Sequence, residues 1–395
     1  VGKLSYSLYL YHWPIIVALE FSTGGLTPTI GTLGVVLSFV PAYLSFRFVE
    51  TPFRTARRFV EPPARGLRYG LGLTAVGVLS GLSILAFIGI NERSELVAAT
   101  SEIGAASNDS DGNVDDPVGG LDVIEPLIEI DLPDQLPAAT IPPLTSVADD
   151  NPSVYDEGCH QNHARSDPIA CEYGTAGGPM VVLVGDSQAA QWVPAFEAIV
   201  ARAGWHFYSF SKSACPFGLM LMGVRGEPYD ACMEWNRNVI DLLVDEMRPD
   251  LVISTSSNSN LPMNPDGTIP DTDQRLDLYR RGLTEAVEEL TAAGIQVALL
   301  ADTPRPRFDI PECLASEVSV AACSVAREEA NTYSLQGDVA EALGIPYADM
   351  ADFICTPTVC PAVIENVIVW RDTNHMTATY ARSLAGALMQ ALPDV

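Results

Sequence analysis

The sequence is poor in basic residues and has no cysteine pair at the C-x-x-C spacing, and both shortages exclude classes of function. Of its 395 residues, 22 are Lys or Arg and 50 are Asp or Glu, which gives a formal net charge of −28 at pH 7. Because nucleic-acid binding needs clustered positive charge to neutralise phosphates, we expect no nucleic-acid partner. No C-x-x-C pair occurs, which argues against a zinc ribbon. His160 and His163 follow Cys159 closely enough to be metal ligands, but no second ligand cluster accompanies them, so we expect no metal site.

Cysteine is absent from the first 158 residues, and all eight cysteines lie beyond them. An even count confined to one region predicts disulfides, and therefore an oxidising compartment. Many pairings are possible. The spacing favours pairs that are neighbours in the sequence: Cys159–Cys171, Cys215–Cys232, Cys313–Cys323 and Cys355–Cys360.

Three apolar stretches lie before residue 91, at about residues 4–21, 26–46 and 67–90. The third is uncharged after Arg68 and long enough to cross a bilayer. The first two contain prolines, which transmembrane helices tolerate when they pack in a bundle. Arginines cluster between the second and third stretches, and this bias predicts that the intervening loop is cytoplasmic. Everything after residue 90 is then outside the cytoplasm, in agreement with the disulfide prediction.

Residues 91–150 are rich in acids, Pro and Gly, and they contain no aromatic residue. Such a composition buries too little apolar surface to offset the entropy of ordering the chain. We therefore expect residues 91–150 to form an acidic, disordered and extended linker.

From residue 151 onward, apolar runs typical of buried strands alternate with amphipathic segments typical of helices. This alternation predicts an α/β fold with a parallel sheet covered on both faces. Strands are expected at 180–184, 205–210, 251–255, 296–300 and 345–347, and helices at 188–203, 235–246, 272–293, 319–343 and 377–392.

Ser187 and His375 are the candidate catalytic residues. Ser187 follows the first predicted strand directly, at the edge of the sheet where active sites of such folds lie. There it would begin a helix, whose free N–H groups can stabilise an oxyanion. Asp372 precedes His375 by three residues and can accept from one ring nitrogen, leaving the other free to take the Ser187 proton. The alternative interpretation is that Asp186 and Ser187 only cap a helix.

These motifs resemble a known family. Gly185-Asp186-Ser187-Gln188-Ala189, followed by residues 372–377, is similar to the first and last motif blocks of the SGNH/GDSL hydrolase superfamily. Residues 4–15 and 46–54 resemble the end of the membrane acyltransferase-three family. The fused order is similar to bacterial cell-surface O-acetyltransferases that modify peptidoglycan, lipopolysaccharide or related glycans.

The resemblance implies a three-layer, flavodoxin-like SGNH domain at residues 151–395, outside the plasma membrane of a bacterium. Residues 1–60 would hold the last two transmembrane helices of the acyltransferase domain, and residues 61–90 an additional one. The earlier helices of that domain would precede residue 1, so this chain would be a C-terminal fragment that binds no cofactor. Acyl-CoA, as acetyl-CoA, would be the donor for the full-length protein.

The resemblance also implies roles for individual residues. Ser187 would be the nucleophile, His375 the base and Asp372 the residue that orients it. The superfamily supplies oxyanion donors from a Gly and an Asn in two further blocks, and here the first of these blocks has no Gly. The candidate donors are the amides of Ser187 and Ala214 and the side chain of Asn258 or Asn260.

The leading hypothesis for function is therefore O-acyl transfer, most simply of acetyl, to a surface glycan through an acyl-serine intermediate. A carbohydrate O-acetyl esterase would use the same residues with water as acceptor. A non-catalytic glycan-binding domain is the third alternative. Trp192, Trp235 and Trp370 could line a sugar site, although such residues more often belong to a core.

Overall fold

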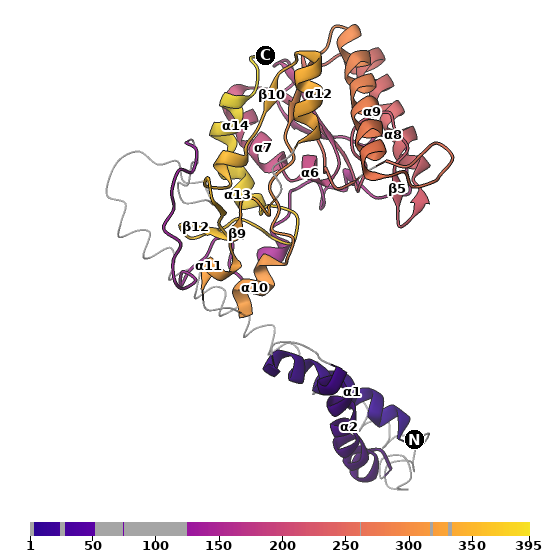
Figure 1. Ribbon diagram of the computed structural model, residues 1–395, viewed down its shortest axis with the longest axis vertical. Helices are drawn as coiled ribbons and strands as arrows, with labels where there is room; N and C mark the ends of the chain where they lie inside the picture. The colour runs from indigo at the N-terminus through magenta and orange to yellow at the C-terminus, as the bar shows by residue number, and fades with distance from the viewer. Residues whose placement is uncertain are drawn as a thin grey trace. The chain divides into compact units, whose positions relative to one another are not determined.

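The computed structural model describes residues 4–23, 28–51, 74, 125–260, 262–316, 319–330 and 334–395. The chain divides into two compact units, residues 1–109 and 110–395, and each is described here by itself (Figure 1).

The first unit contains two packed helices, α1 (Ser5–Thr23) and α2 (Pro28–Ser45). The π-helical turn η1 (Phe46–Glu50) continues α2, and Ser7 Oγ donates to Glu50 Oε2 at 3.0 Å. Among the described residues, one helical window, Gly31–Phe48, is long and apolar enough to cross a membrane, and α1 is less apolar. Apart from Thr74, the predicted membrane stretch at 67–90 lies outside the described residues.

The second unit is built on a mixed sheet with the strand order β1-β4-β3-β7-β8-β10. Neighbouring strands in this order are parallel, and β2 adds an antiparallel edge pairing to β4. The strands are β1 (His160–Gln161), β2 (Cys171–Gly174), β3 (Met180–Gly185), β4 (His206–Lys212), β7 (Leu251–Thr255), β8 (Gln296–Leu300) and β10 (Tyr347–Ala348).

Helices cover both faces of this sheet, which gives three layers (Figure 1). Successive strand residues point to opposite faces. Thus Val181 and Leu183 of β3 join one hydrophobic core, whereas Val182 and Val184 join the other. The first core contains residues of α7 (Val193–Ala203), α13 (Ala378–Ser383) and α14 (Ala385–Ala391), and the second contains residues of α8 (Asp230–Asp241), α9 (Thr272–Ala292) and α12 (Leu335–Leu343). The predicted α/β fold with a three-layer parallel sheet is confirmed.

Short elements complete the described part of this unit. Three two-stranded ribbons pair β5 (Gly223–Val224) with β6 (Glu227–Pro228), β9 (Val325–Ala326) with β11 (Val359–Cys360), and β12 (Val363–Ile364) with β13 (Val367–Ile368). The remaining helical elements are α6 (Ser187–Ala190), α10 (Ile310–Ser316), α11 (Val320–Cys323), η2 (Val147–Asp149), η3 (Leu242–Met247) and η4 (Ala351–Phe353).

The predicted linker ends too late in the chain. Residues 125–150 pack against the rest of the second unit instead of forming a free tether. The Leu127 amide donates to the Asp352 carbonyl at 2.7 Å, and Ile141 forms a parallel bridge with Val367. Val147 is buried in the first core. The apolar residues of this segment are few and are separated by prolines and acids, so its amino-acid composition does not show that it is ordered. We call residues 125–150 the strap.

The helix predicted at 319–343 is also wrong as a single element. The structure has α11, then the short strand β9, and only afterwards α12. A disulfide joins Cys323 at the end of α11 to Cys313 in α10. Ser334 caps α12, because its hydroxyl accepts from the Gly337 amide.

Candidate active site

The turn between β3 and α6 presents Ser187. β3 ends at Gly185, where an added Cβ would lie 1.9 Å from the Thr255 carbonyl oxygen of β7, so only glycine fits. Asp186 is the N-cap, and its carboxylate accepts from the Gln188 amide at 2.9 Å. Ser187 is therefore the first residue of α6, and it lies at the carboxyl ends of parallel strands.

The structure brings Ser187, His375 and Asp372 together in hydrogen-bonded order. His375 Nε2 lies 2.9 Å from Ser187 Oγ, and His375 Nδ1 lies 2.8 Å from Asp372 Oδ2. When Nδ1 carries the proton and donates to the carboxylate, Nε2 is left to accept from the serine hydroxyl. The histidine side chain is 15% exposed, which leaves the pair within reach of a substrate.

A tight loop fixes the Asp372–His375 segment. Asp372 Oδ1 accepts from the amides of Asn374 and His375, each at 2.7 Å. The Arg371 amide donates to the His375 carbonyl at 3.0 Å, and Trp370 pairs with Met376 in an antiparallel bridge. The loop thus holds the imidazole at a fixed distance from its carboxylate.

The electrostatics of this loop keep Asp372 ionised. Burial alone would raise the pKa of Asp372, but the hydrogen bonds and charge of His375 and the charge of Arg371 together lower that pKa below its ordinary value. Arg371 itself lies 5.4 Å from the ring centre of Tyr155. The carboxylate can therefore stabilise an imidazolium at neutral pH.

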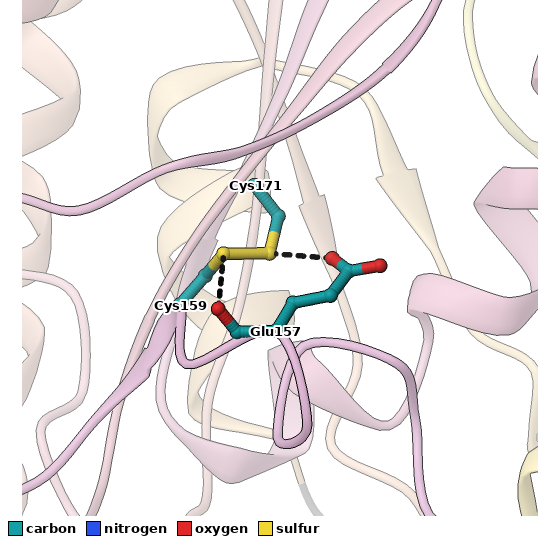
Figure 2. Close-up of side chains that lie close together, drawn as sticks. All are labelled: Glu157, Cys159 and Cys171. Atoms are coloured by element: carbon teal, nitrogen blue, oxygen red, sulfur yellow. Dashed lines mark hydrogen bonds between the residues drawn. A yellow bond between two sulfur atoms is a disulfide. The ribbon is translucent and has the colours of Figure 1, made fainter.

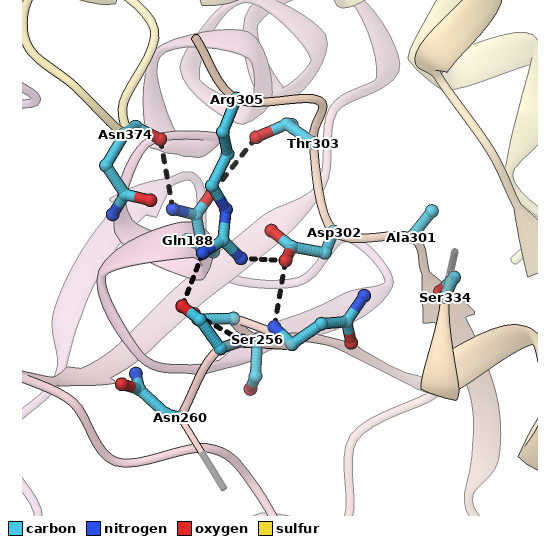
Figure 3. A network of polar contacts seen from close by, with 12 residues as sticks. Gln188, Ser256, Asn260, Ala301, Asp302, Thr303, Arg305, Ser334 and Asn374 are labelled. Atoms are coloured by element: carbon cyan, nitrogen blue, oxygen red, sulfur yellow. Dashed lines mark hydrogen bonds and ion pairs between the residues drawn. The ribbon is translucent and has the colours of Figure 1, made fainter. Parts of the chain in front are cut away.

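Two glutamines of the α6 region attach the histidine loop to the serine helix, and sequence analysis did not identify them as functional. Gln188 Nε2 donates to the Asn374 carbonyl at 3.2 Å, and the Met376 amide donates to Gln191 Oε1 at 2.9 Å. These contacts lie on either side of His375. Thr303 connects the two glutamines: its hydroxyl donates to Gln188 Oε1 at 3.0 Å (Figure 3) and accepts from Gln191 Nε2 at 3.1 Å. The only sequence signal for them was that Gln188 and Gln191 are three residues apart, which places both on the same side of one helical turn.

Asp186 lies beneath the serine and joins β3 to the loop after β7. Its carboxylate accepts from the Ser257 amide at 3.0 Å and from Asn260 Nδ2 at 3.1 Å, in addition to Gln188. The side chain is fully buried, and this burial raises the pKa of Asp186 even though its hydrogen bonds lower it. Asp186 is thus a structural member of the motif.

The candidate oxyanion donors differ in what they bind. Within the described residues, the amides of Ser187 and Ala214 donate no hydrogen bond. Ala214 has a φ of 50°, a left-handed conformation that favours glycine, at the block where the superfamily has Gly. The Asn260 amide group already donates one hydrogen to Asp186, and the Asn258 backbone amide donates to Asp302 Oδ2 at 2.8 Å. Among the described candidates, the Ser187 and Ala214 backbone amides are therefore the ones with no acceptor of their own.

His160 binds neighbouring hydroxyl groups of the protein, and the three tryptophans lie in the hydrophobic cores. His160 lies 3.0 Å from the hydroxyls of both Ser211 and Ser213, which lead into Ala214. Burial, followed by the charges of His375 and Arg371, lowers the pKa of His160 to about 4. The tryptophans 192, 235 and 370 are fully buried, so they belong to the cores and do not line a sugar site.

The four disulfides of the structure are the neighbour-in-sequence pairs, Cys159–Cys171, Cys215–Cys232, Cys313–Cys323 and Cys355–Cys360. Glu157 lies beside the first of them, with Oε2 2.9 Å from Cys171 Sγ (Figure 2). Three potential metal ligands meet there. Because both sulfurs are in a disulfide, however, neither is a thiolate that could bind a metal.

A pocket of about 600 Å³ opens beside the histidine loop. Thr373 and Asn374, the two residues between Asp372 and His375, line one part of it. The rest is lined by Ser259, Arg305 and Arg307. The pocket thus places polar and positively charged side chains next to the histidine loop.

The fold and the site define an SGNH-type domain, and comparison with protein families agrees. The family of SGNH domains fused to AT3 domains matches residues 158–390, so the chain belongs to this family. The O-acetyltransferase OatA of Staphylococcus aureus is 41% identical over 56 residues, a match that covers 14% of this chain and 9% of OatA.

Two solved structures align with parts of this chain at low identity. The periplasmic domain of the Salmonella Paratyphi A lipopolysaccharide acetyltransferase aligns with a TM-score of 0.42 at 13% identity, covering 55% of this chain and 84% of that one. The acetyl xylan esterase AlAXEase aligns with a TM-score of 0.33 at 15% identity, covering 54% of this chain and 100% of the esterase.

Proposed function

We propose that this chain carries the extracytoplasmic half of an O-acyltransferase, in which Ser187 accepts an acyl group, most simply acetyl, and passes it to a hydroxyl of a surface glycan. The observation that carries this proposal is the 2.9 Å separation of His375 Nε2 and Ser187 Oγ, with Asp372 on the other ring nitrogen. Membership of a family defined by fusion to AT3 domains supports transfer over simple hydrolysis.

The first half-reaction forms the acyl-enzyme. His375 Nε2 takes the Ser187 proton as Oγ attacks the acyl carbonyl carbon, and Asp372 stabilises the imidazolium. The amides of Ser187 and Ala214 donate to the oxyanion of the tetrahedral intermediate, each worth about 10²–10³ in rate if it acts like other such donors. The intermediate collapses, the leaving group takes the proton from His375, and acyl-Ser187 remains.

The second half-reaction reverses these roles. A sugar hydroxyl loses its proton to His375 Nε2 while its oxygen attacks the acyl-Ser187 carbonyl. Collapse of this intermediate breaks the ester to Ser187, and His375 returns the proton to Oγ. Water in place of the sugar hydroxyl would give an esterase, so the acceptor decides the reaction.

The remainder of the protein has a complementary role in this proposal. The membrane part would deliver acetyl groups from cytoplasmic acetyl-CoA, and the SGNH domain would lie outside the plasma membrane of a bacterium. Disulfides in the described domain and the apolar window Gly31–Phe48 both support this arrangement.

A chromogenic acetyl ester tests the proposal with the full chain in detergent. Wild type should turn over the ester, while Ser187→Ala and His375→Ala should each lose nearly all turnover because the two residues act as a unit. Adding a glycan acceptor to wild type should then produce acetylated sugar. Equal turnover in all three proteins would reject the triad. Ester turnover with no acetylated sugar for any acceptor would favour the esterase.

A further inference from the structure

The pocket beside His375 has an unusual charge for this chain. Acids outnumber bases by 50 to 22 in the sequence, yet the described residues that line the pocket include two arginines and no acid. The pocket also adjoins the reacting atoms, since its lining residue Asn374 has Nδ2 3.3 Å from His375 Nε2. A ligand group bound here would therefore belong to the molecule that reacts at Ser187.

One of these arginines is already neutralised. Arg305 forms an ion pair with Asp302 and donates to Ser259, and its side chain is only 11% exposed (Figure 3). Burial raises the pKa of Asp302 to about 6, even though the charge of Arg305 lowers it, so the carboxylate is largely ionised at pH 7. The pair is close to neutral as a unit, and its role is to form a fixed wall of the pocket.

The other arginine has a free charge. Among the described residues, the Arg307 guanidinium makes no ion pair or hydrogen bond, and the side chain is exposed. Its backbone is held in place, because the Arg307 amide donates to the Thr373 carbonyl at 3.2 Å and its φ is 65°. A residue other than glycine is strained in this region of φ, and strain of this kind is often retained at binding sites. The contact to Thr373 anchors Arg307 to the catalytic loop itself.

We infer that this pocket is a subsite for an anionic group of the acceptor glycan, a carboxylate or a phosphate, and that Arg307 binds it. The inference rests on the proposed function and adds the acceptor class, a negatively charged sugar. A guanidinium donates two parallel hydrogen bonds to either anion, which would orient the sugar as well as attract it. A neutral glycan would leave this charge unused.

Equilibrium binding to the Ser187→Ala chain tests the inference without any chemistry. Three oligosaccharides of the same length are compared by calorimetry: a neutral one, one with a sugar carboxylate and one with a sugar phosphate. The anionic ligand should bind about 10- to 100-fold more tightly than the neutral one at low salt. This preference should shrink as ionic strength rises. The tighter of the two anionic ligands identifies the group.

Two further variants in the Ser187→Ala background make the test specific. Arg307→Gln should abolish the preference for the anion. Arg225→Gln should keep it, because Arg225 is likewise exposed with a left-handed φ of 55° but lies in the β5–β6 turn and not in the lining of the pocket. Equal affinity for the neutral and anionic ligands, or a preference that survives Arg307→Gln, would overturn the inference. Failure of ester turnover in wild type would instead reject the proposed function, and the two failures are separable.

Discussion

Gln191 offers a strict test of how the histidine loop is held. Gln191→Met keeps the side-chain length but removes the acceptor of the Met376 amide at 2.9 Å and the donor to Thr303 at 3.1 Å. Gln191 and Met376 are both fully buried, so water cannot replace these bonds without rearrangement. An unsatisfied buried amide costs about 1–3 kcal/mol of folding free energy. For a unit of this size the melting temperature should fall by about 2–12 °C.

The effect on rate should exceed the effect on stability. Met376 follows His375 directly, so loss of its anchor lets the imidazole move away from Ser187 Oγ. A displacement of about 1 Å at a reacting group costs about 10²-fold in rate. We therefore expect kcat for a chromogenic acetyl ester to fall about 10²-fold at a temperature where the variant is folded. KM should change little, because no substrate contact is removed.

Tyr380→Phe is the matched control. Tyr380 is also fully buried, and its hydroxyl donates to the Phe353 carbonyl at 2.7 Å, a contact that involves none of the catalytic residues or oxyanion candidates. This variant should lose similar stability and retain kcat. If both variants lose stability to the same extent and both retain the wild-type kcat, the reasoning that Gln191 positions His375 is refuted.

The remaining predictions concern the carboxylate, the buried histidine and the disulfides. Asp372→Asn should reduce ester turnover by about 10⁴-fold with the fold intact, because the wrong imidazole tautomer is favoured; near-normal turnover in a folded variant would contradict the orienting role. The pKa of His160 is lowered from 6.5 to about 4 by burial. Between these pH values the histidine is therefore protonated in the unfolded chain and neutral in the folded chain. The free energy of unfolding should therefore fall by up to about 3 kcal/mol between pH 6.5 and pH 4, and His160→Gln should remove this slope in denaturant titrations at several pH values. Thiol titration of the denatured, unreduced protein should find no free cysteine, and Cys215→Ala/Cys232→Ala should cost about 3 kcal/mol for the loop that this disulfide closes; abundant free thiols would count against the oxidising compartment.

The sheet and the reacting residues were predictable from sequence because their signals are local. Buried runs such as Met180–Gly185 are long, and a serine directly after one of them must lie at the carboxyl edge of a parallel sheet. The acid three residues before His375 lies within one turn of chain, so their contact depends little on the rest of the fold.

The features that were missed depend on contacts between distant segments. The strap at 125–150 is ordered by Asp352 and Val367, more than two hundred residues away, which a count of acids and prolines cannot reveal. Gln191 and Thr303 are ordinary polar residues until the fold places them beside Met376. The position of Arg305 and Arg307 in a pocket was likewise not predictable, because the fold brings them beside Thr373 and Asn374 from another part of the chain.

Trapping the acyl-enzyme tests the central claim most directly. The chain is mixed with a chromogenic acetyl ester, quenched in acid within the burst phase, digested and analysed by mass spectrometry. The account predicts one added acetyl group on the peptide that contains Ser187, and none in the Ser187→Ala or His375→Ala chains under the same conditions. Acetylation confined to another residue, with Ser187 unmodified while the ester turns over, would contradict it.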